Sequence, residues 1–230
     1  MTKKIQIATI ILGFNLIFTS NAFSALKYDS NVPQAIQAQM ESDLQFIKGI
    51  QGSAQTAFHK EIFGNVDGAS YSQFFEQRVR SVGLSTCGNA NAVACVQMIY
   101  FNKMWLTDNF IKFSHPQISR LMVVFHEACH SELAKGGWAH DKCPVPFLDE
   151  NGKDKVSIWT GAKLEGEAAC DSKYQGSYGS STIMLKNIAQ FCSNCSSKVK
   201  MDADMYAMDQ LGRVNNESVK KAMIADFNAN

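Results

Sequence analysis

The sequence predicts an α+β fold that is mostly helical and carries a small sheet. Apolar residues recur at helical spacing from Val32 to about Ile50 and again from Ser70 to Val82. The stretch from Val93 to Leu106 is instead rich in β-branched and aromatic residues, which favours a strand. Helical spacing returns in three segments of the tail: Thr182 to Phe191, Val199 to Leu211 and Ser218 to Phe227. One strand-forming stretch among several helices implies that the sheet is small.

The first 24 residues have the pattern of a secretory signal peptide. Two lysines near the start precede the apolar run from Ile5 to Phe18, and the small residues Ala22 and Ser24 come just before a cut at Ala25. The apolar run is shorter than the roughly 20 residues that a membrane span needs. We therefore expect an exported protein, secreted or periplasmic, with no stable membrane anchor after cleavage.

The remaining chain, residues 25–230, has the length of one domain. Its first part, residues 25–60, is long enough for a short propeptide or for a packing helix. The formal net charge is only +1, so the composition gives no reason to expect nucleic acid as a partner.

All seven cysteines follow the expected cut, as in proteins exported into an oxidising compartment. Cys87 and Cys95 bracket a loop rich in Gly and Asn, which predicts a local disulfide. Cys192 and Cys195 are a second candidate pair, because no second Cys-x-x-Cys is present to complete a four-thiolate metal site. Seven is an odd number, so at least one thiol is free, bound to another chain or close to a metal.

Residues 126–130 carry the motif with the clearest chemistry, His-Glu-x-x-His. On a helix His126 and His130 lie one turn apart on the same face, so both imidazoles can reach one metal ion. Zinc accepts nitrogen ligands, and catalytic zinc sites combine three protein ligands with a water. Glu127 would lie beside the metal, where its carboxylate could take a proton from that water. We therefore expect one zinc ion, with Glu127 as a general base.

This motif and its apolar lead-in, Ile118 to Phe125, resemble the active-site helix of the zincin metallopeptidases. The resemblance implies a zincin-like domain over residues 25–230 that hydrolyses peptide bonds in a protein or peptide substrate. It also implies that the stretch from Val93 to Leu106 contains the strand that borders the cleft, although an ordinary core strand is an equally good interpretation.

Resemblances to two families within the zincins suggest different third ligands. Glu167 and Asp171 are four residues apart and would share a helix face. They resemble the gluzincin arrangement, which implies that Glu167 binds zinc and Asp171 orients a histidine. The order Asp171, a tyrosine, then Asp204 also resembles the aspzincins, or deuterolysins. That resemblance implies Asp171 as third ligand, Tyr174 or Tyr178 as stabiliser of the oxyanion, and Asp204 in a substrate pocket.

The metzincin pattern does not support His140 as third ligand. That pattern has a glycine three residues and a histidine six residues after the second histidine, whereas this chain has Leu133 and Gly136 there. His140 lies ten residues after His130 and is expected only to line the cleft.

Helix geometry suggests the hypothesis of a further disulfide. Cys129 follows His126 by three residues and Cys170 follows Glu167 by three, so each thiol would lie about 60° around its helix from a ligand. Two such helices facing each other across the metal could be joined by a disulfide between Cys129 and Cys170.

Two alternatives to a peptidase remain open. The first is a non-catalytic exported binding domain with a structural zinc, although such a site has no use for a carboxylate between its histidines. The second is a disulfide-stabilised interaction domain without a metal, which requires the His-Glu-x-x-His spacing to be accidental.

Overall fold

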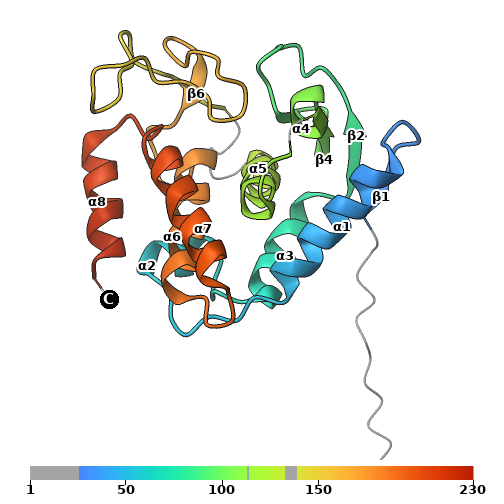
Figure 1. Ribbon diagram of the computed structural model, residues 1–230, viewed down its shortest axis with the longest axis horizontal. Coiled ribbons are helices and arrows are strands. Elements are labelled where there is room, and N and C mark those ends of the chain that lie inside the picture. The colour runs from blue at the N-terminus through green and yellow to red at the C-terminus, as the bar shows by residue number, and fades with distance from the viewer. Residues whose placement is uncertain (1–25, 113, 133–138, 230) are drawn as a thin grey trace, which may run out of the picture.

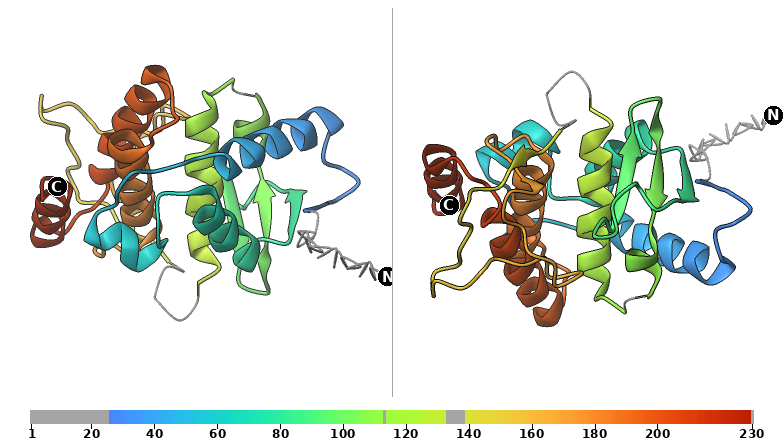
Figure 2. Two further views of the ribbon diagram at one scale, coloured as in Figure 1. Left: turned by 90° about the horizontal axis from the view of Figure 1, so that it is seen from below. Right: turned by 90° about the horizontal axis from the view of Figure 1, so that it is seen from above.

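Helix α5, Gln117–His130, lies at the centre of the molecule, with a sheet on one side and the C-terminal helices on the other (Figures 1 and 2). The structure is a computed structural model that describes residues 26–112, 114–132 and 139–229. The predicted signal peptide, residues 1–24, lies outside the described residues. The predicted α+β class is confirmed, because helices dominate and the sheets are small.

The larger sheet has four short strands in the order β1-β2-β4-β3. The strands are β1 Lys27–Tyr28, β2 Ser81–Leu84, β3 Ala94–Gln97 and β4 Tyr100–Leu106. Strands β1, β2 and β4 run parallel to one another, and β3 pairs antiparallel with β4 at the edge of the sheet. The stretch that the sequence predicted as strand is therefore a hairpin of two strands. Four consecutive apolar residues, Met98 and Ile99 in its turn and Tyr100 and Phe101 at the start of β4, are exposed.

Three helices precede or interrupt the sheet: α1 Gln34–Lys48, α2 Ala57–Ile62 and α3 Gly68–Arg78. Helix α1 buries Met40, Leu44 and Ile47, so residues 34–48 form the packing helix that the spacing predicted. Helix α3 ends at Arg78, earlier than predicted, because the chain extends at Val79 and enters β2. A short helix, α4 Asp108–Lys112, follows the hairpin.

Helix α5 is held in place by an aromatic cluster around Phe125. Rings from α3 and from the residue after α2 lie 5.9 to 6.4 Å from the Phe125 ring, centroid to centroid: Phe63, Tyr71, Phe74 and Phe75. Phe125 is only 1% exposed. Because this face of α5 is fixed in the core, the opposite face is presented in a defined direction.

The C-terminal helices are α6 Ser177–Phe191, α7 Ser197–Leu211 and α8 Glu217–Phe227. All three predicted tail helices are confirmed, with α6 beginning five residues earlier than expected. Helices α6 and α7 lie side by side (Figures 1 and 2). None of the helices in the described part of the chain is long and apolar enough to cross a membrane.

Between α5 and α6 the chain forms a second, two-stranded sheet of β5 Asp141–Lys142 and β6 Ala168–Cys170. The prediction that Glu167 and Asp171 share a helix face is therefore wrong. Glu167 immediately precedes β6 and Asp171 immediately follows it. A spacing of four between two acidic residues does not specify a helix, and Gly166 adopts φ 70° directly before this segment.

Three disulfides are formed. The predicted pairs Cys87 with Cys95 and Cys192 with Cys195 are confirmed. The third bond joins Cys143 to Cys170, so the predicted pairing of Cys170 with Cys129 is wrong. Cys170 lies on β6 rather than on a helix facing α5, and Cys129 is buried without a disulfide. Three disulfides are typical of proteins from an oxidising environment.

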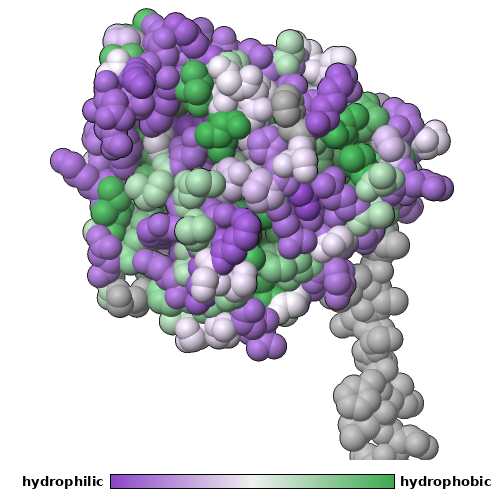
Figure 3. Space-filling view, viewed as in Figure 1, coloured by the Kyte–Doolittle hydropathy of each residue, from purple (hydrophilic) through white to green (hydrophobic). Residues whose placement is uncertain are grey.

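The face shown in Figure 3 is mixed in hydropathy: hydrophilic side chains are interspersed with small groups of apolar ones.

Candidate metal centre

Helix α5 presents His126, Glu127 and His130 away from the aromatic cluster. The helix begins directly after Pro116, whose fixed φ suits a helix start, and its last residue is His130. The rings of His126 and His130 lie 5.0 Å apart, centroid to centroid. The i, i+4 spacing thus brings the two imidazoles together as the sequence predicted.

His140 completes a group of three histidines. Its Nε2 atom lies 3.1 Å from Nε2 of His126 and 3.1 Å from Nε2 of His130. The three nitrogen atoms lie within 4.8 Å of one another, so together they could bind a metal ion. Burial lowers the pKa of His126 well below its ordinary value, and the neighbouring His130 and His140 lower it further. The imidazole therefore stays neutral, which is the form that binds metals.

Asp171 holds His140 in this position. Its Oδ1 atom lies 2.9 Å from Nδ1 of His140, and its Oδ2 accepts a hydrogen bond of 2.7 Å from the backbone N–H of Tyr178. With its proton on Nδ1, His140 has a free lone pair on Nε2 for a metal. Asp171 thus has the orienting contact that the gluzincin resemblance implied, although its partner is His140.

The approach of Asp171 to helix α6 depends on Gly176, the residue before the helix. A Cβ atom at this position would lie 2.4 Å from Oδ2 of Asp171. Ser177, the first residue of α6, places its Oγ 3.4 Å from Nδ1 of His130. The start of α6 therefore supports two of the three histidines.

Glu127 is a buried carboxyl group without a compensating partner. It is 5% exposed, and its Oε2 forms no hydrogen bond within the described part of the chain. Burial raises the pKa of Glu127 to about 8. Glu127 lines the same cavity as the three histidines, where its carboxyl group could exchange a proton with a bound molecule.

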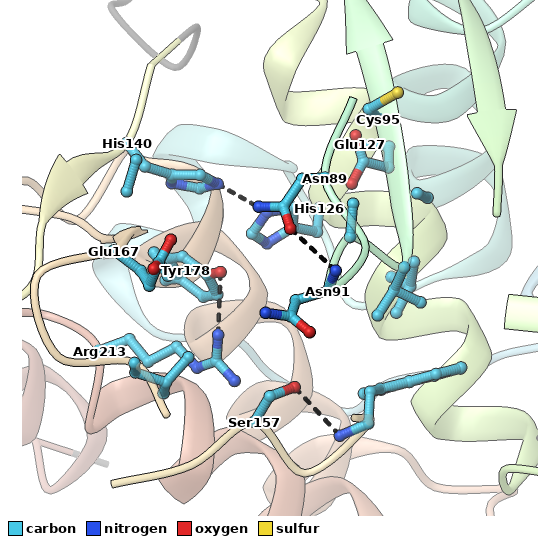
Figure 4. A pocket seen from close by; sticks show the side chains of 18 of the residues that line it. Asn89, Asn91, Cys95, His126, Glu127, His140, Ser157, Glu167, Tyr178 and Arg213 are labelled. Carbon is cyan, nitrogen blue, oxygen red and sulfur yellow. Dashed lines mark hydrogen bonds between the residues drawn. The ribbon is translucent and has the colours of Figure 1, made fainter. Parts of the chain in front are cut away.

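Glu167 does not belong to the histidine group, so His140 occupies the place that the sequence assigned to Glu167. Glu167 is exposed and lines the cavity nearby (Figure 4). The sequence did not favour His140 as a ligand, because its spacing from His130 does not fit the metzincin pattern. The disulfide between Cys143 and Cys170 brings the segment after His140 close to Asp171, and that pairing could not be read from seven cysteines.

The cavity beside the histidines has a volume of about 350 Å³. One wall is the edge strand β3, which contributes Ala94, Cys95 and Val96. The candidate cleft strand is thus β3, the first strand of the hairpin. The opposite wall includes Glu167, Tyr178 and Arg213 (Figure 4).

Tyr178, one of the two tyrosines that the aspzincin resemblance implied, lies in the site. Its ring is 4.5 Å from that of His126 and 4.6 Å from that of His140, centroid to centroid. Its hydroxyl accepts a hydrogen bond of 3.0 Å from Nη1 of Arg213 (Figure 4). Burial raises the pKa of Tyr178, so the hydroxyl stays protonated at neutral pH.

Two other residues of that resemblance lie elsewhere. Tyr174 stacks on Phe58 and donates a hydrogen bond of 2.9 Å to Glu61, and it does not line the cavity. Asp204 forms an ion pair with Lys186 and is also not part of the cavity wall. The predicted roles of Tyr174 and Asp204 in a substrate site are therefore not supported.

Several cavity residues had no signal in the sequence. They are Asn89 and Asn91 from the loop before β3, Trp159 from the segment between β5 and β6, and Arg213 from the turn after α7. None belongs to a motif, and long-range folding alone brings them together. Comparisons of the chain with protein families, with curated proteins and with solved structures found no match.

Proposed function

We propose that this chain is an exported zinc-dependent metallopeptidase of the zincin type, most simply an endopeptidase. One observation carries the proposal: three histidines converge on one point, and the unpartnered carboxyl group of Glu127 lines the same cavity. Three imidazoles match the ligand set of catalytic zinc sites that use three histidines. A purely structural metal would not require a buried carboxyl group at the cavity wall.

In this proposal His126, His130 and His140 hold the zinc ion, and Asp171 keeps His140 in the binding tautomer. The zinc supplies a polarised scissile carbonyl and a water of lowered pKa. The positive charge of a bound ion would favour the ionised form of Glu127, which would accept a proton from a water at a carboxylate oxygen and return it to the leaving amine. The hydroxyl of Tyr178, held by Arg213, donates a hydrogen bond to the carbonyl oxygen as negative charge develops.

The cavity wall suits an extended peptide. Strand β3 is at the edge of its sheet, with one side unpaired within the described residues, and it runs along the cavity. An extended segment could pair with such an edge through its backbone. The three disulfides and the signal-peptide pattern support export.

The test combines zinc content with hydrolysis of a labelled general protein substrate. Wild-type protein should bind about one zinc ion per chain. Glu127→Gln should keep the zinc but hydrolyse roughly 10²- to 10⁴-fold more slowly, because it cannot take up the proton. His140→Ala should lose the zinc.

Glu167→Gln is the matched control, since this exposed carboxylate lines the same cavity outside the histidine group. It should keep the zinc. Zinc retained by His140→Ala but lost by Glu167→Gln would restore Glu167 as the third ligand. Zinc binding without cleavage of any protein substrate would instead favour the non-catalytic binding domain.

A further inference from the structure

Arg213 is a buried cation on the wall of the cavity. It follows helix α7 and is 6% exposed. Nη1 donates to the hydroxyl of Tyr178, but Nε has no hydrogen-bond partner within the described part of the chain. The carboxylate of Asp209 forms an ion pair with Nε at 3.8 Å, which is too long for a hydrogen bond. Within the described residues the guanidinium therefore has no anion hydrogen-bonded to it.

A buried charge is costly unless an opposite charge and hydrogen bonds compensate for it. The other charged groups of the cavity do not supply this compensation. Lys163 is exposed and forms its ion pair with Asp154. Neither the buried Glu127 nor the exposed Glu167 forms an ion pair with Arg213. Across the cavity from Arg213 lies the neutral amide of Asn91 (Figure 4). An anion that hydrogen-bonds to the guanidinium can come from a molecule in the cavity.

From this arrangement we infer that the cavity binds a substrate carboxylate, and that Arg213 is the residue that recognises it. The planar guanidinium fork matches the geometry of a carboxylate and can donate two parallel hydrogen bonds. This inference rests on the proposed function, in which the cavity holds the substrate.

The position of Arg213 says which part of the substrate carries the carboxylate. The ring of Tyr178 contacts His126 and His140, and its hydroxyl contacts Arg213. One tyrosine side chain thus separates Arg213 from the metal ligands. The carboxylate belongs to a residue close to the cleaved bond, either as the free C-terminus of the peptide or as an acidic side chain.

The experiment measures peptide binding in the Glu127→Gln protein, in which the peptides persist. One pair of probes is acetyl-trialanine with a free C-terminal carboxylate and the same peptide as its C-terminal amide. A second pair is acetyl-Ala-Glu-Ala-amide and acetyl-Ala-Gln-Ala-amide. Dissociation constants are measured by calorimetry with and without zinc, because a carboxylate can also bind the metal directly.

In at least one pair the carboxylate probe should bind about 10-fold or more tightly than its neutral partner, as expected for a charge-assisted hydrogen bond. The pair that discriminates identifies the source of the carboxylate. Adding Arg213→Met should remove the difference, and Arg213→Lys should restore part of it. The preference should persist without zinc.

Lys163→Met is the control, because it removes a cation that also lines the cavity but has its own partner, Asp154. It should leave the preference unchanged. Peptides that bind equally in both pairs would overturn the carboxylate site while leaving the peptidase proposal intact. A preference lost in Lys163→Met but kept in Arg213→Met would overturn the assignment to Arg213. A zinc-loaded protein that binds none of the four peptides would count against both proposals.

Discussion

At the scale of single residues, Asp171 is the side chain on which most contacts of the site converge. It is 4% exposed, and its two oxygens contact His140 and the backbone of Tyr178. Its backbone N–H donates to the carbonyl of Arg213. Asp171 therefore connects the third histidine to the cavity wall that carries Tyr178 and Arg213.

Asp171→Asn should weaken zinc binding by about 10- to 100-fold, the range typical for a carboxylate that orients a metal-binding histidine. The Asn side chain has the same size, but it is neutral and has one oxygen where the carboxylate has two. It therefore cannot accept hydrogen bonds from both His140 and the backbone of Tyr178. Competition with a coloured chelator measures the affinity.

Asp204→Asn is the comparison, since it removes a carboxylate from α7 whose partner is Lys186 and which lies outside the cavity. It should bind zinc like the wild type. An Asp171→Asn protein with unchanged zinc affinity would show that the contact with His140 does not orient the ring for a metal.

The sequence motif predicted some residues of the site and missed others. The positions of His126, Glu127 and His130 relative to one another follow from helix geometry alone, so the sequence predicted them. His140 and Arg213 reach the site through folds of the chain that no local pattern encodes. The expected ligand Glu167 is close to the site in space, yet the direction of a short strand, not helical spacing, decides what its side chain reaches.

At the scale of secondary-structure elements, the short sheet of β5 and β6 carries both His140 and Asp171. His140 directly precedes β5 and Asp171 directly follows β6. The disulfide between Cys143 and Cys170 joins the same two segments. With strands of two and three residues, backbone pairing alone gives these segments little stability.

Replacing both Cys143 and Cys170 by Ser should therefore weaken zinc binding by at least about 10-fold. A native disulfide contributes roughly 2–4 kcal/mol, and 1.4 kcal/mol corresponds to a factor of about ten. Zinc affinity is measured together with far-ultraviolet circular dichroism to confirm that the helices remain.

The double Ser variant of Cys192 and Cys195 is the control. That disulfide connects the end of α6 to the start of α7 and lies outside the cavity wall. It should leave zinc affinity near the wild-type value. Equal losses in the two double variants would mean that general stability, and not the placement of His140, sets the affinity.

Sequence reasoning succeeded for the elements that have long repeating faces. Helices α1, α6 and α7 each bury several residues, and α8 buries Met223 and Phe227 one turn apart, so their periodicity is visible. It failed between residues 139 and 176, where β5 and β6 are too short to show alternation. The hairpin of β3 and β4 was predicted as one strand because its turn, Met98 and Ile99, is apolar like the strands on either side.

At the scale of the whole molecule, stability should depend on the buried histidine His59. It is fully buried, with Nε2 2.8 Å from the hydroxyl of Tyr71 and Nδ1 3.1 Å from the carbonyl of Gly64. Burial lowers the pKa of His59 to about 4, although the contact with Gly64 acts in the opposite direction. The folded protein therefore binds the His59 proton less readily than the unfolded chain, where the pKa is close to 6.5.

The buried, neutral form of His59 contributes to the free energy of unfolding. Because its pKa in the folded protein lies below that in the unfolded chain, this contribution is fully present above about pH 6.5 and is lost as the pH falls toward 4. Between pH 7 and pH 5 the free energy of unfolding should fall by about 2 kcal/mol more in the wild type than in His59→Gln. Urea unfolding with intact disulfides measures both. An equal fall in the two proteins would show that His59 does not titrate in this way.

On the proposed function and the predicted export, the bond between Cys143 and Cys170 would also determine when the site is completed. Thiols remain reduced in a cytosol, so a newly made chain would have its His126 and His130 pair but no secured third histidine. The peptidase would thus be inactive in the cell that makes it, and oxidation after export would complete its site.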